Sequence, residues 1–281
     1  MSSNDNLNSY LQFLDSRRGK IFSSRGGWRA GEAIWNCGHS MMHDLVGEKT
    51  YFQVFILNMT KKLPEKEVAD WFEWSCMCLS WPDPRIWCNH IGTLAGSLRC
   101  SPVAGVSAGN MAQDSRMFGC GVMPDASAFI QKAKRQHDSG MTVTEIIDED
   151  LASKRVPPGS TPVVVGFARP LAKGDERVDA MEIVAKELGF EVGPHMAIAN
   201  QVHNELVERQ NEGINFAGYC AAFMSDQGFT VKEIHRLYNI WVVSGVNACY
   251  AEGFDNPPET FLPRRCDDVN YVGVENRTLP G

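Results

Sequence analysis

The most informative segment of this chain is Val163-Val164-Val165-Gly166-Phe167-Ala168-Arg169-Pro170-Leu171-Ala172-Lys173-Gly174-Asp175-Glu176-Arg177. A short run of β-branched residues leads into a loop that contains glycines, a proline and several charged side chains. Apolar residues then recur with helical spacing at Met181, Val184, Ala185 and Leu188. Loops of this kind carry many binding and catalytic residues. We therefore expect this loop, residues 166–177 and called the central loop below, to present side chains to a ligand.

The overall composition is that of an ordinary globular protein. The chain has 281 residues, of which 43% are hydrophobic and 22% are charged, and this is enough to bury a large core. Its formal net charge of -7 provides no positive surface for nucleic acid or for an anionic membrane. We therefore expect small molecules or proteins as partners, with neither nucleic acid nor membrane.

The N-terminus and the cysteines both indicate the cytoplasm. Residues 1–8 carry neither the basic nor the apolar region of a secretory signal, and no apolar run is long enough to span a bilayer. The nine cysteines are an odd number and are scattered through segments that resemble core. This pattern favours reduced thiols over a disulfide framework.

Metal-ligand patterns in the sequence are weak. Cys76-Met77-Cys78 lacks the two-residue spacer of a zinc or redox pair. His39 and His43 have the four-residue spacing of ligands on one helix face, but no third ligand is evident. A metal-dependent hydrolase that also used His203 and Glu205 ranks last among the interpretations. We assign no metal site and no permanently bound cofactor.

Helical patterns dominate the rest of the chain and predict an all-α fold, with a large and a small helical domain. A capping box at Thr230 and Glu233 begins a helix expected over about 230–252. A proline-rich linker at 156–162 marks the expected boundary between the domains. The predicted parts are an N-terminal arm at 1–30, large-domain helices at 31–155, the central loop and closing helices of the small domain at 156–252, and a tail at 253–281.

Four segments resemble, in chain order, motifs of the citrate synthase family. They are 114–121, where the family has Gly-Pro-Leu-His-Gly-Gly; the central loop, where it has Gly-Phe-Gly-His-Pro-Leu-Tyr and then Gly-Asp-Pro-Arg; 213–216, where it has Asn-Val-Asp-Phe; and the tail at Arg264, Arg265 and 271–273. The resemblance runs from about Trp28 to the C-terminus and is densest after Val163. This chain is shorter than typical members.

The resemblance implies a mostly helical homodimer, in which a small domain closes on a ligand and the tail at 253–281 packs back on the dimer. Members of the family condense an acyl-CoA with a 2-oxo acid, or cleave citryl-CoA. An Asp removes an α-proton from the thioester, one His stabilises the enol, and another His polarises the ketone.

The residues that would perform this chemistry are replaced here. The enol-stabilising His falls on Phe118, which cannot donate a hydrogen bond, and the carbonyl-polarising His falls on Arg169. The base Asp falls on Asn215, which is no base at neutral pH. A dicarboxylate-binding Arg aligns with Val242. The resemblance therefore implies a divergent member that does not carry out ordinary citrate synthesis.

The arginines that bind carboxylates in the family are retained better than its catalytic residues. Arg177 and one of Arg264 and Arg265 match arginines that bind carboxylates in the family. We assign substrate binding to these three arginines and to Phe118, and we assign contacts with coenzyme A to Lys173.

Three residues are candidates for catalysis: Arg169, Asp114 and Asn215. Arg169 supplies a fixed cation for a carboxylate or a thioester oxygen, and Asp114 is the nearest replacement base. Each has a purely structural alternative. Arg169 would pair with Asp175 or Glu176, Asp114 would cap a turn, and Asn215 would begin a helix.

Two functions remain open on this basis. The first is an enzyme that forms or breaks a C–C bond, or performs other α-carbon chemistry, on a carboxylated acyl-CoA or related carboxylate, with the CoA thioester as substrate. The second is a non-catalytic protein of the same fold that binds a carboxylate metabolite or a protein partner. Loss of all three family residues favours the second, whereas replacements that keep polarity, His by Arg and Asp by Asn, favour the first.

Overall fold

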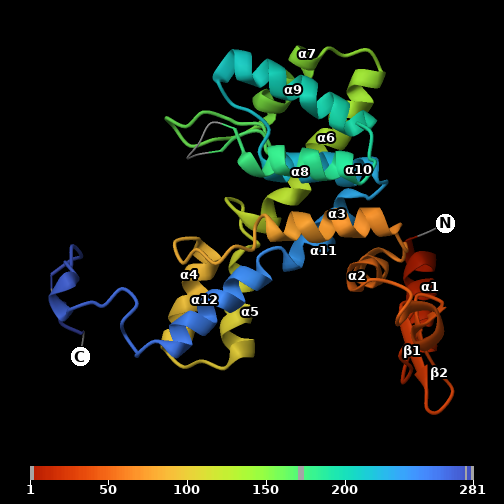
Figure 1. The fold of residues 1–281 in the computed structure, drawn as a ribbon, viewed down its shortest axis with the longest axis horizontal. Coiled ribbons are helices and arrows are strands. Elements are labelled where there is room, and N and C mark those ends of the chain that lie inside the picture. The colour runs from red at the N-terminus through yellow and green to blue at the C-terminus, as the bar shows by residue number, and fades with distance from the viewer. Residues whose placement is uncertain (1–2, 170–173, 276, 280–281) are drawn as a thin grey trace.

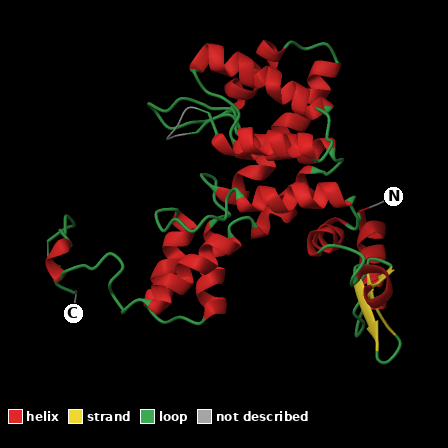
Figure 2. Cartoon of the chain, viewed as in Figure 1, coloured by secondary structure: helices red, strands yellow, loops and turns green. Residues whose placement is uncertain are grey.

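The computed structural model describes residues 3–169, 174–275 and 277–279, and within them the chain is mainly helical (Figures 1 and 2). The predicted all-α, citrate-synthase-like class is confirmed. The helices are α1 (Ser3–Ser16), α2 (Tyr51–Thr60), α3 (Lys66–Met77), α4 (Trp87–Ser97), α5 (Pro102–Ala112), α6 (Met123–Asp138), α7 (Val143–Ser153), α8 (Glu176–Glu187), α9 (Pro194–Gln210), α10 (Phe216–Asp226), α11 (Val231–Leu237) and α12 (Val243–Asp255). Shorter turns are the π-helix η1 (Met41–Leu45) and the 3-10 helices η2 (Gly119–Val122), η3 (Tyr238–Ile240) and η4 (Cys266–Asp268).

Local sequence signals set several helix starts. Capping boxes begin α2 at Thr50, α7 at Thr142 and α11 at Thr230, each with a Gln or Glu three residues later that bonds back to the cap. Prolines occupy the first turns of α5, α6 and α9, where their missing N–H costs nothing. The predicted start at Thr230 is therefore confirmed.

The single helix expected over about 230–252 is wrong. The structure has α11, then the turn η3, then α12 beginning at Val243. Ser80 explains part of the break, because its hydroxyl donates a hydrogen bond of 2.9 Å to the carbonyl oxygen of Trp241. In an unbroken helix the carbonyl oxygen of Trp241 would accept a backbone N–H, and here it accepts the Ser80 hydroxyl.

Helix α10 forms the centre of the main hydrophobic core. Every residue from Gly218 to Ser225 is buried, and α6, α8, α9 and α11 all contact this helix. Trp71 of α3 stacks on Phe223 with ring centroids 3.6 Å apart, and Trp241 stacks on Phe216 at 5.7 Å. The core therefore holds Phe216, the first residue of α10, in a fixed position, and the central loop packs against this end of the helix.

Helices α4, α5 and α12 form a second packed group, side by side in Figure 1. Glycines permit their close approach. A Cβ atom at Gly96 would lie 2.2 Å from the carbonyl oxygen of Tyr250, and one at Gly253 would lie 2.3 Å from that of Thr93. The small residues between Trp87 and Ala112 therefore let these helices pack closely.

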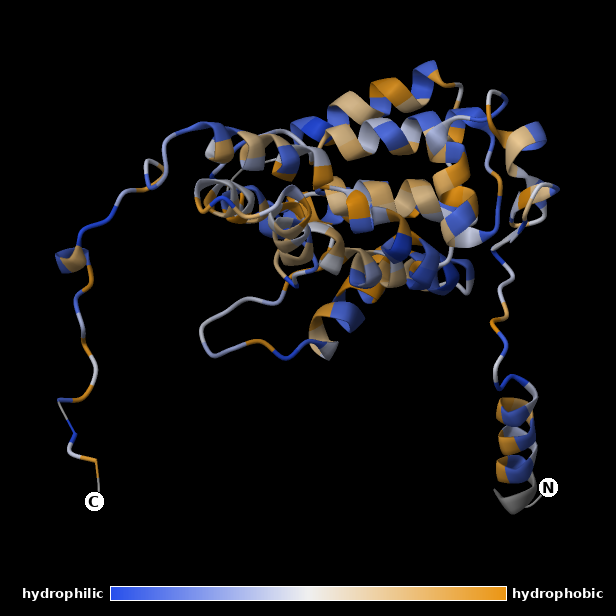
Figure 3. Cartoon of the chain, turned by 90° about the horizontal axis from the view of Figure 1, so that it is seen from below, coloured by the Kyte–Doolittle hydropathy of each residue, from blue (hydrophilic) through white to orange (hydrophobic). Residues whose placement is uncertain are grey.

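Both ends of the described chain project from this helical body (Figures 1 and 3). Helix α1 leads into an antiparallel sheet of β1 (Gly26–Arg29), β2 (Ala33–Asn36) and β3 (His39–Ser40). His39 and His43 therefore lie on a strand and in the π-helix η1, not on one helix face. Many apolar side chains in both ends are exposed, including Leu11, Phe13 and Tyr271. No helix among the described residues is long and apolar enough to cross a membrane.

Candidate functional site

The first half of the central loop is held against the start of α10 by two glycines. Gly166 has φ of +96°, a conformation that side chains with a Cβ atom rarely adopt. A Cβ atom at Gly218 would lie 2.1 Å from the carbonyl oxygen of Gly166. On either side of Gly166, Val164 and Phe167 are buried. The loop thus lies directly on α10, with its charged residues following.

Asn215 joins the loop to α10 through its backbone N–H and through both the nitrogen and the oxygen of its side-chain amide. Its backbone N–H donates to the carbonyl oxygen of Gly166 at 2.9 Å. Its side-chain amide donates to the carbonyl oxygen of Ala168 at 2.7 Å and accepts the N–H of Gly218 at 3.1 Å. This is the helix-start role that the sequence leaves open for Asn215.

Asp175 is the buried anchor of the second half of the loop. Its side chain has no exposed surface, and it forms two bonds with the guanidinium of Arg177, at 2.7 and 2.6 Å. It also accepts the backbone N–H of Phe216 at 2.9 Å. Arg177 lies over the rings of Phe216 and Trp81, at 5.1 and 5.8 Å. Arg177 is therefore built into the scaffold by its own loop.

Arg169 also forms an ion pair, but its partner Glu176 is exposed to solvent. Its guanidinium donates to the Glu176 carboxylate at 2.5 and 3.0 Å and to the carbonyl oxygen of Gly174 at 3.2 Å, with Asp175 at 3.6 Å. The side chain of Glu176 is 74% exposed. The bond from Arg169 lowers the pKa of Glu176 to about 2. The predicted alternative, an ion pair with Asp175 or Glu176, is present.

These two arginine pairs differ in how easily a ligand can replace the acid. An exposed ion pair contributes about 0–1 kcal/mol, because water and salt compete for both charges. A carboxylate with no exposed surface cannot leave its arginine without stranding a buried charge, which costs several kcal/mol. Glu176 can therefore leave Arg169 at a lower cost than Asp175 can leave Arg177.

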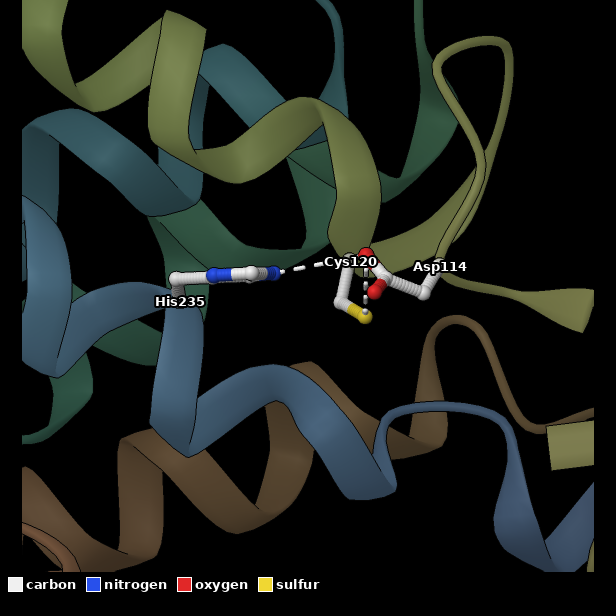
Figure 4. A group of neighbouring side chains, drawn as sticks. All are labelled: Asp114, Cys120 and His235. Atoms are coloured by element: carbon white, nitrogen blue, oxygen red, sulfur yellow. Dashed lines mark hydrogen bonds and ion pairs between the residues drawn. The ribbon is translucent and has the colours of Figure 1, made fainter. Parts of the chain in front are cut away.

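Asp114 and Phe118 lie in the turn after α5, away from these bonds. Phe118 packs edge to face on Trp87 at 5.6 Å. The Asp114 carboxylate lies 3.4 Å from Nε2 of His235 and 3.9 Å from Sγ of Cys120 (Figure 4). Burial, followed by the nearby Asp114 carboxylate, raises the pKa of the Cys120 thiol to about 12. Across the described residues, no hydrogen bond or ion pair joins Asp114 to the arginines of the loop.

The two predicted arginines of the tail lie away from the loop. Arg264 and Arg265 are exposed in the C-terminal tail, which projects from the body in Figure 1. The backbone N–H of Arg265 bonds to its neighbour Asp268 at 2.7 Å. Lys173 lies outside the described residues. A hollow of about 330 Å³ next to Val165 is lined by none of the candidate residues.

Sequence reasoning missed Cys120 and His235. In the sequence Cys120 is one of nine scattered thiols, and His235 falls inside an ordinary amphipathic helix. Their ligand atoms and that of Asp114 all lie within 4.8 Å of one another. Because His235 comes 121 positions after Asp114, no local spacing reveals the group.

Comparison with solved structures identifies the architecture. The chain superposes on citryl-CoA lyase from Hydrogenobacter thermophilus with a TM-score of 0.76 and 24% identity, covering 92% of this chain and 97% of that one. It matches ATP citrate lyase from Methanothrix soehngenii, solved with citrate and coenzyme A, with a TM-score of 0.72 and 17% identity, over 95% of this chain and 44% of that one.

A citrate synthase from the archaeon Thermoplasma acidophilum is a further match, with a TM-score of 0.59 and 16% identity, over 82% of this chain and 59% of that one. No protein-family model matches the sequence, and no curated protein matches it significantly. The similarity therefore rests on three-dimensional structure. The chain has the citrate-synthase-like fold, in the form shared by these lyases and synthases.

Proposed function

We propose that this protein is a divergent enzyme of the citrate synthase type, which forms or cleaves a C–C bond, or performs related α-carbon chemistry, on a carboxylated acyl-CoA. The observation that carries the proposal is the exposed pairing of Arg169 with Glu176, at the loop position where the family places a catalytic histidine. A ligand carboxylate or thioester oxygen replaces Glu176 at little cost, because the Glu176 side chain is 74% exposed. Citryl-CoA lyase and ATP citrate lyase share the fold and support the substrate class.

Arg169 then supplies positive charge where negative charge develops. Loss of an α-proton converts the thioester to an enolate, whose carbon adds to the ketone carbon of a 2-oxo acid. The ketone oxygen becomes an alkoxide, which takes up a proton to give a hydroxyl group. In the reverse direction the hydroxyl group loses its proton, the C–C bond breaks as the ketone re-forms, and the enolate takes up a proton. Asp114 is the proposed base, although it faces His235 and Cys120 in this conformation, and movement of the small domain would have to bring it to the substrate.

The second candidate is a non-catalytic carboxylate-binding protein, and two observations favour it. Asn215 uses its amide for the fold, and Phe118 packs on Trp87, so neither takes over the chemistry of the family residue that it replaces. This candidate needs the same Arg169 site but no base. We also propose a homodimer, because both chain ends expose apolar side chains that a second copy would cover.

Exchange of α-protons separates the two candidates. The protein is incubated in D₂O with acetyl-CoA and with succinyl-CoA, and deuterium in the acyl group is measured by mass spectrometry. The enzyme hypothesis predicts exchange that is reduced at least about tenfold in Asp114→Asn and in Arg169→Ala. Binding without exchange, and without cleavage of citryl-CoA, would leave the non-catalytic candidate. Absence of binding to any CoA ester or carboxylate would overturn both.

A further inference from the structure

We propose that Asp114, Cys120 and His235 form a binding site for a divalent transition metal of the zinc class. Their three ligand atoms lie within 4.8 Å of one another, with Nε2 of His235 and Sγ of Cys120 at 3.4 and 3.9 Å from the same carboxylate oxygen of Asp114 (Figure 4). This inference does not rest on the proposed function, and it replaces the expectation that the chain has no metal site.

The fold brings the three residues together from two distant segments. Asp114 follows α5, and the chain turns back so that Cys120 in η2 lies beside it. Two glycines allow the turn: Gly119 has φ of +74°, and a Cβ atom at Gly121 would lie 2.3 Å from the carbonyl oxygen of Ser115. His235 comes from α11, whose Ile234 and Leu237 are buried in the core.

The distances fit tetrahedral coordination without large movement. Zinc bonds of about 2.0 Å to oxygen and nitrogen and about 2.3 Å to sulfur place the tetrahedral ligand atoms of such a set roughly 3.3–3.5 Å apart. The separation of 3.4 Å between His235 and Asp114 lies in that range, and the 3.9 Å between Cys120 and Asp114 exceeds it by only about 0.4 Å. Both are long for hydrogen bonds between side chains, so neither contact alone accounts for the grouping.

The ligand types select the class of metal. A thiolate with an imidazole and one carboxylate suits zinc, or cobalt in its place, whereas magnesium and calcium prefer sites built from oxygen alone. Cys120 is buried, whereas the side chains of Asp114 and His235 are 63% and 40% exposed. The metal would therefore meet protein on one side and solvent on the other, leaving a fourth position for water or a ligand.

Binding also has a defined charge balance. The Cys120 thiol loses its proton to solvent and becomes a thiolate, and His235 coordinates through neutral Nε2. The thiolate and the Asp114 carboxylate together neutralise the two charges of the metal. A metal there engages the Asp114 carboxylate, so metal binding and the base role proposed above for Asp114 exclude each other in any one molecule.

Cobalt provides a direct test, because its spectrum reports both geometry and sulfur ligation. The full-length protein is stripped with a chelator and titrated with Co²⁺. We expect one equivalent to give the visible bands of four-coordinate cobalt and a thiolate-to-metal charge-transfer band, and zinc to abolish both by displacement. Cys120→Ala should remove the charge-transfer band, and His235→Gln should weaken affinity at least about tenfold.

Two variants keep the test decisive. Cys266→Ser removes an exposed thiol in the tail and should leave the spectrum unchanged. His235→Gln alters a partly exposed side chain, so the result stands even if Cys120→Ala folds poorly. Absence of a charge-transfer band in the native protein, or equal cobalt affinity in His235→Gln, would overturn the proposal.

Discussion

The buried carboxylate of Asp175 accepts the backbone N–H of Phe216 at 2.9 Å and thereby fastens the end of the central loop to the first residue of α10. The same carboxylate holds Arg177 through two further bonds. One side chain thus fixes the segment in which Arg169 lies eight positions before Arg177. Loss of Asp175 should disturb stability and ligand binding together.

Asp175→Asn should destabilise the protein by about 3 kcal/mol, because it leaves the partly buried Arg177 without its counter-charge. Asp179→Asn is the matched control, since Asp179 is exposed on the first turn of α8 and should cost about 0.5 kcal/mol. Urea unfolding followed by circular dichroism measures both. Equal stability of the two variants would show that the Asp175 network is not an anchor.

Gly218→Ala should destabilise the protein by roughly 2 kcal/mol or more, because the new methyl group would lie 2.1 Å from the carbonyl oxygen of Gly166. Gly27→Ala in β1 serves as the control, since its methyl group would make only an ordinary contact, at 3.9 Å, with Trp35. The same unfolding measurement compares them. A Gly218→Ala protein as stable as the native one would contradict the close approach of loop and helix.

Glu176→Gln should tighten the binding of a carboxylate ligand several-fold, because it removes the acid that competes for Arg169. The low pKa of Glu176, about 2, keeps it ionised throughout the neutral range, so a modest decrease in the pH of the assay does not release Arg169. Glu187→Gln, at the exposed end of α8, is the control. Calorimetric titration with succinate and succinyl-CoA gives the affinities, and weaker binding in Glu176→Gln would count against this account.

Cys120 should react slowly with iodoacetamide in the metal-free protein. A pKa of about 12 leaves roughly one thiolate in ten thousand at pH 8, and the side chain is buried. Peptide mass spectrometry should therefore find exposed Cys266 labelled well before Cys120, and both labelled alike in urea. Rapid labelling of Cys120 in the folded protein would show that the thiol is neither buried nor protonated.

Local sequence signals predict much of the fold, but they predict the arrangement of the candidate site less well. Capping residues such as Thr230 and the glycines of the helix interfaces are local signals with direct structural causes. The break between α11 and α12 is hidden in the sequence, because Tyr238, Trp241 and Val242 continue one buried stripe through it. At the break, Ser80 from far earlier in the chain bonds to the carbonyl oxygen of Trp241, and such a tertiary contact leaves no local signal in the sequence.

The sequence predicts the pairing of Arg169 with an acidic residue only as an alternative to ligand binding, and it does not predict the pairing of Arg177 with Asp175. It places Arg169 and Glu176 seven residues apart, and nothing in that spacing says whether the acid or a ligand takes the guanidinium. The grouping of Asp114 with His235 joins residues 121 positions apart, and tertiary packing alone creates it.

The central claim is that Arg169 is the cation that receives a ligand carboxylate, and calorimetric titration with succinyl-CoA tests it most directly. Native protein and Arg169→Ala are compared, with Arg209→Ala as the charge-matched control, since Arg209 pairs with Asp148 on α7. We predict that binding weakens about 10- to 100-fold in Arg169→Ala, as expected for a lost charged hydrogen bond, and is unchanged in Arg209→Ala. Equal affinity in native protein and Arg169→Ala would contradict the claim.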